Sequence, residues 1–318
     1  YHYIHALIKK LCPNEFGNFR DWHWAYSYLK SKCGGGWYDV PVESIDFDDL
    51  DCVWRKITTR NGSPLKLIEK YQLWSPVAAI GVFVKLHLPL RTYQTRMLDS
   101  GEADAERYEK GKWVKNKNKF AIPNLTKGVF KKITEYKDNQ IYTGFYINTN
   151  KTADINKLPS EKGYVIPWQN EIVLYWLEKL RNWQEKYNKI ISPTPCTSLN
   201  NSHLGQKFAT QTLKEMGSIS FLLRHAAAKK KEDRVKPILD STLNALWLNL
   251  LIDFEKDIAK EGQTFSDGSR IKFVEISPNS KRLKYYPLFP LHSLRVSFIT
   301  SYLQDGKVPL PILSKLIA

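Results

Sequence analysis

The chain has 318 residues, of which 42% are hydrophobic and 13% aromatic, a composition that excludes a disordered protein and allows a large buried core. Lys and Arg number 48 against 32 Asp and Glu, which gives a formal net charge of +16. Such a surplus favours a polyanionic partner such as nucleic acid, because each neutralised phosphate releases condensed counterions. The alternative is a basic protein without such a partner.

The cysteines indicate no metal site and no secreted framework. Cys12, Cys33, Cys52 and Cys196 form no C-x-x-C pair, so we expect free thiols in a reducing compartment. No signal segment opens the chain. The longest apolar stretch, residues 76–90, is interrupted by Lys85 and His87 and predicts a buried helix instead of a membrane span. We therefore expect a cytoplasmic protein without membrane contact.

Residues 1–63 are expected to form short helices, and NGSP (61–64) is the candidate linker that follows them. The segment SIDFDDLDCVW (44–54) carries Asp46, Asp48, Asp49 and Asp51. We interpret it as the acidic start of a helix, where carboxylates are favourable. The alternative is a metal site, which would make the protein a metal-dependent nuclease.

From about residue 65 a helical run leads to LHLPLRTYQTRML (86–98), in which Pro89 is expected to end one helix and open the next, with Arg91 in its first turn. Residues 110–132 then hold eight lysines and no acidic residue. A solvated face is one explanation, but charge of one sign over this length favours contact with DNA phosphates. The predicted contacts are Lys110, Lys112, Lys115, Lys117, Lys119, Lys131 and Lys132.

The rest of the chain predicts an α+β fold that is mostly helical. Strand patterns at 128–136, 141–149 and 163–168 predict a small three-stranded antiparallel sheet. Apolar periodicity predicts buried helices at 172–187 and 241–259. The remaining segments are a polar stretch at 188–237, expected to be an exposed helix or arm, and a basic loop or hairpin at 266–287.

His292 and Arg295 stand three residues apart at the head of an apolar helix pattern, PLHSLRVSFITSYLQDG (290–306). Residues at this spacing share one helix face. An arginine in such a helix needs an acid or a phosphate, because an unpaired buried charge is costly. Taken alone, this pair is explained as well by a capping histidine and an internal salt bridge.

The surrounding segments resemble the tyrosine recombinases, or phage integrases. HSLRVSFITSYLQDG is similar to the family pattern H-x-L-R-x-x-F-A-T-x-L-x-x-x-G, and LPLRTYQTRMLDSGEAD is similar to its first arginine segment through Arg91, Leu98 and Glu102. The family also carries a lysine between the second and third strands of its sheet, where Lys151 stands in INTNKTADINK. The resemblance covers roughly residues 65–318.

This resemblance implies an integrase-type catalytic domain over residues 64–318, with insertions near 105–127 and 188–237, preceded by a helical region (1–63) that is a DNA-clamping domain or its remnant. It implies attack of a tyrosine hydroxyl on a DNA phosphodiester, which leaves a 3′-phosphotyrosyl bond and needs no cofactor or metal. Arg91 and Arg295 would neutralise the phosphate, Lys151 would act as general acid, and His292 would orient the phosphate or assist proton transfer. The implied partners are double-stranded DNA and three further copies of the chain, in the bacterial nucleoid.

Two departures from the family pattern bear on activity. Gln94 stands where the family usually has Glu, three residues after its first arginine. The Gly-His and the nucleophilic tyrosine of the pattern would fall beyond Ala318, so we expect a fragment that binds DNA without cutting it. The alternative function is a recombinase-like architectural or regulatory DNA-binding protein without catalysis.

Overall fold

The computed structural model describes residues 36–61, 66–134, 140–149, 157, 162–277, 285–306 and 309. Within these residues the chain forms seven α-helices and five antiparallel sheets of two or three strands. The fold is therefore mixed α+β, as the sequence predicts.

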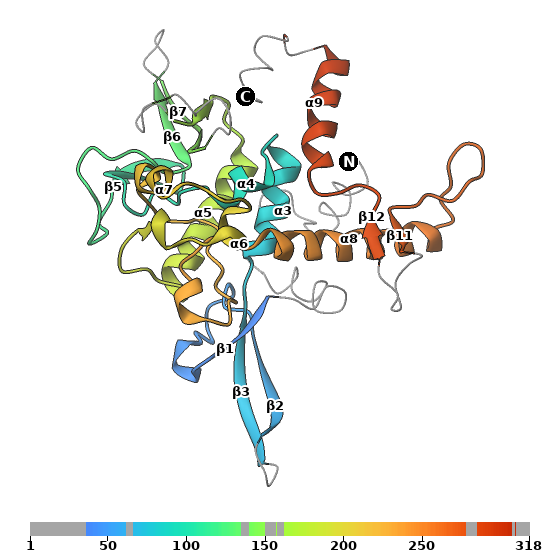
Figure 1. Cartoon of the computed structure of the whole chain (residues 1–318), viewed down its shortest axis with the longest axis horizontal. Helices are drawn as coiled ribbons and strands as arrows, with labels where there is room; N and C mark the ends of the chain where they lie inside the picture. The colour runs from blue at the N-terminus through green and yellow to red at the C-terminus, as the bar shows by residue number, and fades with distance from the viewer. Residues whose placement is uncertain are drawn as a thin grey trace.

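Three long helices meet at the centre of the molecule (Figure 1): α3 (Val77–His87), α5 (Glu171–Tyr187) and α8 (Asp240–Lys260). Trp176 of α5 and Trp247 of α8 are each 1% exposed. A Cβ atom on Gly81 of α3 would lie 2.8 Å from Leu243 Cδ2 on α8, so glycine permits the close approach of these two helices. The predicted helices at 76–90, 172–187 and 241–259 are confirmed.

The first described segment forms a sheet, with strand order β1-β3-β2, from β1 (Trp37–Val40), β2 (Trp54–Asn61) and β3 (Lys66–Trp74). The prediction of short helices is therefore wrong for residues 36–61, and the predicted helical run from about residue 65 is wrong for residues 66–74 and correct from Val77 onward. β-Branched residues favour strand here, and β2 pairs with β3 from Trp54 to Asn61. The β2–β3 hairpin, in which Asn61 pairs with Lys66, extends away from the core (Figure 1). Residues 62–64 of the candidate linker NGSP lie outside the described residues, so the linker stays a prediction.

The aspartates of residues 44–54 anchor this sheet to α5. Lys186 Nζ lies 2.6 Å from carboxylate oxygens of both Asp46 and Asp49, and Lys179 Nζ lies 2.7 Å from Asp51 Oδ1. No α-helix begins in this described segment, so the predicted acidic helix start is wrong. The described residues contain no group of His, Cys, Asp and Glu that could hold a metal ion.

The predicted three-stranded sheet is confirmed: β6 (Phe130–Thr134), β7 (Ile141–Ile147) and β8 (Tyr164–Ile166) are antiparallel, in the order β6-β7-β8. Its buried face carries Phe145, Ile147 and Ile166, all 0% exposed. The sheet therefore packs on the central core, and β7 ends just before the segment that contains Lys151.

Residues 188–237 do not form an exposed helix or arm. They form short elements: β9 (Thr194–Pro195), η4 (Cys196–Ser198), α6 (Asn201–Leu204), α7 (Thr210–Met216), β10 (Ser218–Ile219) and η5 (Lys231–Asp233). Leu222, Leu223 and Arg224 are 0% exposed. The prediction failed because Arg224 has a buried partner, Glu102, which lies 122 residues away in the sequence. Polar composition in this segment therefore does not mean exposure.

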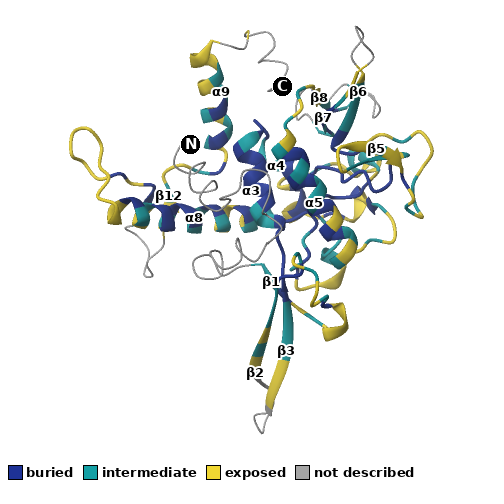
Figure 2. Cartoon of the chain, turned by 180° about the vertical axis from the view of Figure 1, so that it is seen from behind, coloured by how far each residue is buried: buried dark blue, intermediate teal, exposed yellow. Residues whose placement is uncertain are grey.

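The remaining described elements complete the molecule: α4 (Thr92–Arg96), β4 (Glu106–Glu109), β5 (Lys112–Lys115), β11 (Val274–Ile276), β12 (Tyr285–Pro287) and α9 (Ser293–Asp305). β11 and β12 confirm a hairpin at 266–287. Buried residues gather in α3, α4 and α5, while the outer end of α9 is exposed (Figure 2). Cys52 and Cys196 are free thiols. Among the described helices, none has both the length and the apolar character to cross a membrane.

Candidate functional site

Arg91 lies at the N-cap of α4, where Gln94 fixes its backbone. The Arg91 N–H donates to Gln94 Oε1 at 2.9 Å, and Gln94 Nε2 donates to the Thr149 carbonyl at 3.0 Å. Gln94 is 1% exposed, so both bonds are shielded from water. This one side chain joins the start of α4 to the residues that follow β7. Lys151 is two positions beyond Thr149 but lies outside the described residues.

Arg295 reaches the same region from the first turn of α9. Its Nε donates to the Pro89 carbonyl at 2.9 Å, across 206 positions of sequence. Burial lowers the pKa of Arg295, and the nearby positive charge of Arg91 lowers it further. The fold therefore brings Arg91 and Arg295 near one another, while phosphate binding by this pair stays a prediction.

Tyr164, the first residue of β8, belongs to this cluster and was missed from the sequence. Burial raises its pKa to about 12, although the charges of Arg295 and Arg91 and the side chain of Gln94 act in the opposite direction. The hydroxyl therefore stays protonated at neutral pH beside two guanidinium groups. No local motif marks Tyr164; only its place at the start of the third strand could have drawn attention to it.

A buried lysine supports the loop that carries Arg91. Lys85 of α3 is 1% exposed, and its Nζ donates to the Leu90 carbonyl at 2.8 Å. Burial, followed by the charge of Arg295, lowers the pKa of Lys85 to about 8. In the sequence this lysine was noted only as an interruption of an apolar run.

His292 lies at the N-cap of α9, one turn before Arg295, and its side chain is exposed. Its carbonyl accepts the Arg295 N–H at 3.1 Å. His292 therefore stands at the solvent side of the helix that carries Arg295, where a ligand could reach its ring.

The predicted DNA-binding lysines fall into two groups. Five are exposed on or next to the β4–β5 hairpin, and we call them the hairpin lysines: Lys110, Lys112, Lys115, Lys117 and Lys119. The other two are half-buried on β6. Lys132 forms an ion pair with Glu106 at 3.1 Å, and Lys131 lies 5.8 Å from the centre of the Tyr146 ring. The hairpin lysines are thus the predicted contacts that are exposed to solvent, and their contact with DNA stays a prediction.

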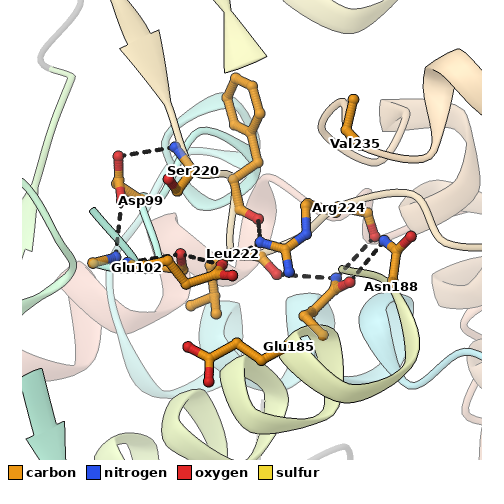
Figure 3. Close-up of polar contacts among 12 residues, drawn as sticks. Asp99, Glu102, Glu185, Asn188, Ser220, Leu222, Arg224 and Val235 are labelled. Carbon is orange, nitrogen blue, oxygen red and sulfur yellow. Dashed lines mark hydrogen bonds and ion pairs between the residues drawn. The ribbon is translucent and has the colours of Figure 1, made fainter. Parts of the chain in front are cut away.

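Glu102, the acid of the first arginine segment, has an internal role. Its carboxylate accepts a hydrogen bond from Ser100 Oγ at 2.7 Å and pairs with Arg224, which is fully buried (Figure 3). On the other side, Gln184 Nε2 donates to the carbonyls of Leu222 and Arg224 at 3.2 and 3.0 Å. This network holds the segment after α4 against α5 and thereby supports the arginine cluster.

Comparison with known proteins identifies the family. A family model described as "Putative integrase" matches residues 1–197, which is more than half of the chain. No curated protein and no solved structure matches. The matched region contains Arg91, Gln94, Lys151 and Tyr164 and ends before α9. The match indicates a role in DNA integration or recombination, and the chain belongs to this integrase family.

Proposed function

We propose that the protein is an integrase of the tyrosine-recombinase type, which breaks and rejoins DNA through a 3′-phosphotyrosyl intermediate. The observation that carries this proposal is the meeting of Arg91 and Arg295. Arg91 is held through Gln94, and Arg295 is held through the Pro89 carbonyl. Two arginines from distant segments, each held by a hydrogen bond and near enough for their charges to interact, form a site suited to one phosphodiester.

Electrostatics explains what such a pair would do. Negative charge grows on the non-bridging oxygens when a hydroxyl attacks the phosphorus, and two preorganised guanidinium forks can neutralise it. Partial burial strengthens these interactions, and the lowered pKa of Arg295 reflects the same burial. An anion between the two arginines would also relieve their mutual repulsion.

The other roles are those that the resemblance to the tyrosine recombinases implies. Lys151 would donate the proton to the departing 5′-oxygen, and His292 would orient the phosphate or assist proton transfer. The hairpin lysines would contact the DNA backbone without reading its sequence. DNA held in this way would be double-stranded, and four copies of the chain would act on two duplexes.

The test is covalent trapping with the full-length protein and genomic DNA fragments of its source. Wild type should form a protein–DNA adduct that survives SDS and EDTA. Arg91→Ala and Arg295→Ala should lose the adduct while retaining most duplex binding. Arg270→Ala, a matched change at an arginine whose side chain is 61% exposed, should keep both.

The outcomes separate the candidate functions. Duplex binding without any adduct in wild type would favour the architectural DNA-binding function over the enzyme. An adduct that persists in both arginine variants would refute the assigned phosphate site. Loss of DNA cleavage on adding EDTA would instead indicate metal-dependent chemistry.

A further inference from the structure

A cavity of about 790 Å³ opens beside the arginine cluster. Its walls come from α4, the end of β7, the start of the β8 segment and the α6–α7 region, and Arg91, Gln94 and Thr149 form part of its lining. This volume lies within the range of roughly 300–1,000 Å³ that is typical of small-molecule sites. The family resemblance gives this cavity no role.

One wall of the cavity is aromatic. The rings of Tyr93 and Phe208 are stacked, with centroids 6.2 Å apart and an angle of 24° between their planes. Phe208 is only partly buried, so its ring still has exposed surface on which a planar ligand could stack. Aromatic side chains of this kind stack on nucleobases of any sequence, because every base has a π-face.

Another wall of the cavity includes Asn148 and Thr149, each of which has a buried polar atom without a hydrogen-bond partner in the described part of the chain. Asn148 Nδ2 donates to the Met97 carbonyl at 2.5 Å, which fixes the amide, yet Asn148 Oδ1 is buried with no hydrogen-bond partner among the described residues. Thr149 Oγ1 is buried and unpaired in the same sense. Buried polar atoms are nearly always satisfied, so two unpaired atoms on adjacent residues of a cavity wall point to a ligand with N–H or O–H groups.

The charge of the lining favours an anion. Its basic residues are Arg91, Arg96, Lys127 and Lys162, and its acids are Asp99, Glu215 and Asp240. Burial raises the pKa of Asp99 to about 7, so this carboxyl is partly neutral at physiological pH. The remaining acids do not balance the four cations.

We propose that this cavity receives one unstacked nucleotide. Its base would stack on the Tyr93–Phe208 pair, the edge of the base would meet Asn148 and Thr149, and its phosphate would lie toward Arg91 and Lys162. The proposal rests on the proposed function in one respect, the source of the nucleotide. This nucleotide would be flipped out of a DNA strand next to the phosphate that Arg91 binds. Extrusion costs least where a base is already unpaired, so the cavity should select distorted or bulged DNA.

The experiment compares the affinity of wild type for a fully paired duplex with its affinity for the same duplex carrying one unpaired 2-aminopurine, by fluorescence anisotropy. Wild type should prefer the bulged duplex about tenfold or more, because stacking is recovered in the cavity. Phe208→Ala should abolish this preference and leave paired-duplex affinity unchanged. Phe265→Ala, at a phenylalanine that is 55% exposed and outside the lining, should keep it.

A second variant guards against misfolding. Thr149→Val removes only the unpaired hydroxyl and keeps the carbonyl that Gln94 uses, and it should reduce the preference severalfold with an unchanged melting temperature. Equal affinity of wild type for both duplexes, or a preference that survives Phe208→Ala, would overturn the proposal.

A third arm uses deoxynucleoside monophosphates and separates this proposal from the proposed function. One possible result is that the protein binds monophosphates but no DNA, and that Phe208→Ala abolishes the monophosphate binding. This result would refute the integrase function and the DNA source of the nucleotide. Binding of both duplexes with equal affinity, together with the covalent adduct, would leave the integrase function intact and refute the role of the cavity.

Discussion

Gln94 offers the sharpest test of how the arginine cluster is held. Gln94→Ala removes the acceptor for the Arg91 N–H and the donor to the Thr149 carbonyl, bonds of 2.9 and 3.0 Å made by a side chain that is 1% exposed. A buried hydrogen bond contributes about 0.5–1.5 kcal/mol, and a group left unsatisfied costs about 1–3 kcal/mol. Both groups are partly buried, so we expect a loss of about 2–3 kcal/mol in the free energy of unfolding.

Gln94→Glu, which introduces the usual family residue, separates the two bonds. A carboxylate can still accept the Arg91 N–H, but it cannot donate to the Thr149 carbonyl while it is ionised. We expect a smaller loss than for alanine, because the new charge also attracts Arg91 and Arg295. Glutamine suits this position because its Nε2 can donate to the Thr149 carbonyl, which a carboxylate oxygen cannot do.

The assay is urea unfolding at pH 7, followed by circular dichroism, with Gln304→Glu as the same change at an exposed position. Gln304→Glu should leave the midpoint unchanged. If Gln94→Ala were as stable as wild type, the bridge between α4 and the end of β7 would not be formed in solution. The reasoning on Arg91 would then lose its structural basis.

Further predictions concern the buried charges and the basic surface. Arg224→Met should cost about 3–5 kcal/mol in urea unfolding because it leaves Glu102 buried and unpaired, and a second change, Glu102→Leu, should restore much of the loss. The raised pKa of Asp99, about 7 against 3.8, means that the folded state retains a proton that the unfolded state releases. Unfolding free energy should thus fall by up to about 4 kcal/mol between pH 4 and pH 7, and Asp99→Asn should flatten this slope; an unchanged slope would contradict the assignment. Changing the hairpin lysines to glutamine should weaken duplex binding equally on all sequences and lower the salt slope by about 0.9 for each lost phosphate contact; a loss confined to some sequences would contradict backbone contact.

Sequence patterns predicted best where a long stretch has one dominant periodicity. The helices at 171–187 and 240–260 and the sheet at 130–166 follow from apolar spacing and β-branched residues. The sheet at 37–74 was missed, because its alternating polar and apolar residues are stabilised mainly by cross-strand pairing, which no local window contains. The polar stretch at 188–237 was misjudged for a related reason: its buried Arg224 pairs with Glu102, which is distant in the sequence.

The sequence by itself determined which chemical groups are present: a basic chain, a run of lysines that contains no acidic residue, and arginines at 91 and 295 in segments that resemble one enzyme family. Only the tertiary structure decided which of these groups meet. In the folded chain Arg91 lies near Arg295, although about two hundred residues separate them in the sequence. Tyr164 and Lys85 lie near the same arginines, and a cavity opens beside this cluster. The physical reason is that a residue's type is local, whereas its partner, its burial and hence its pKa depend on contacts between segments that no sequence spacing reveals.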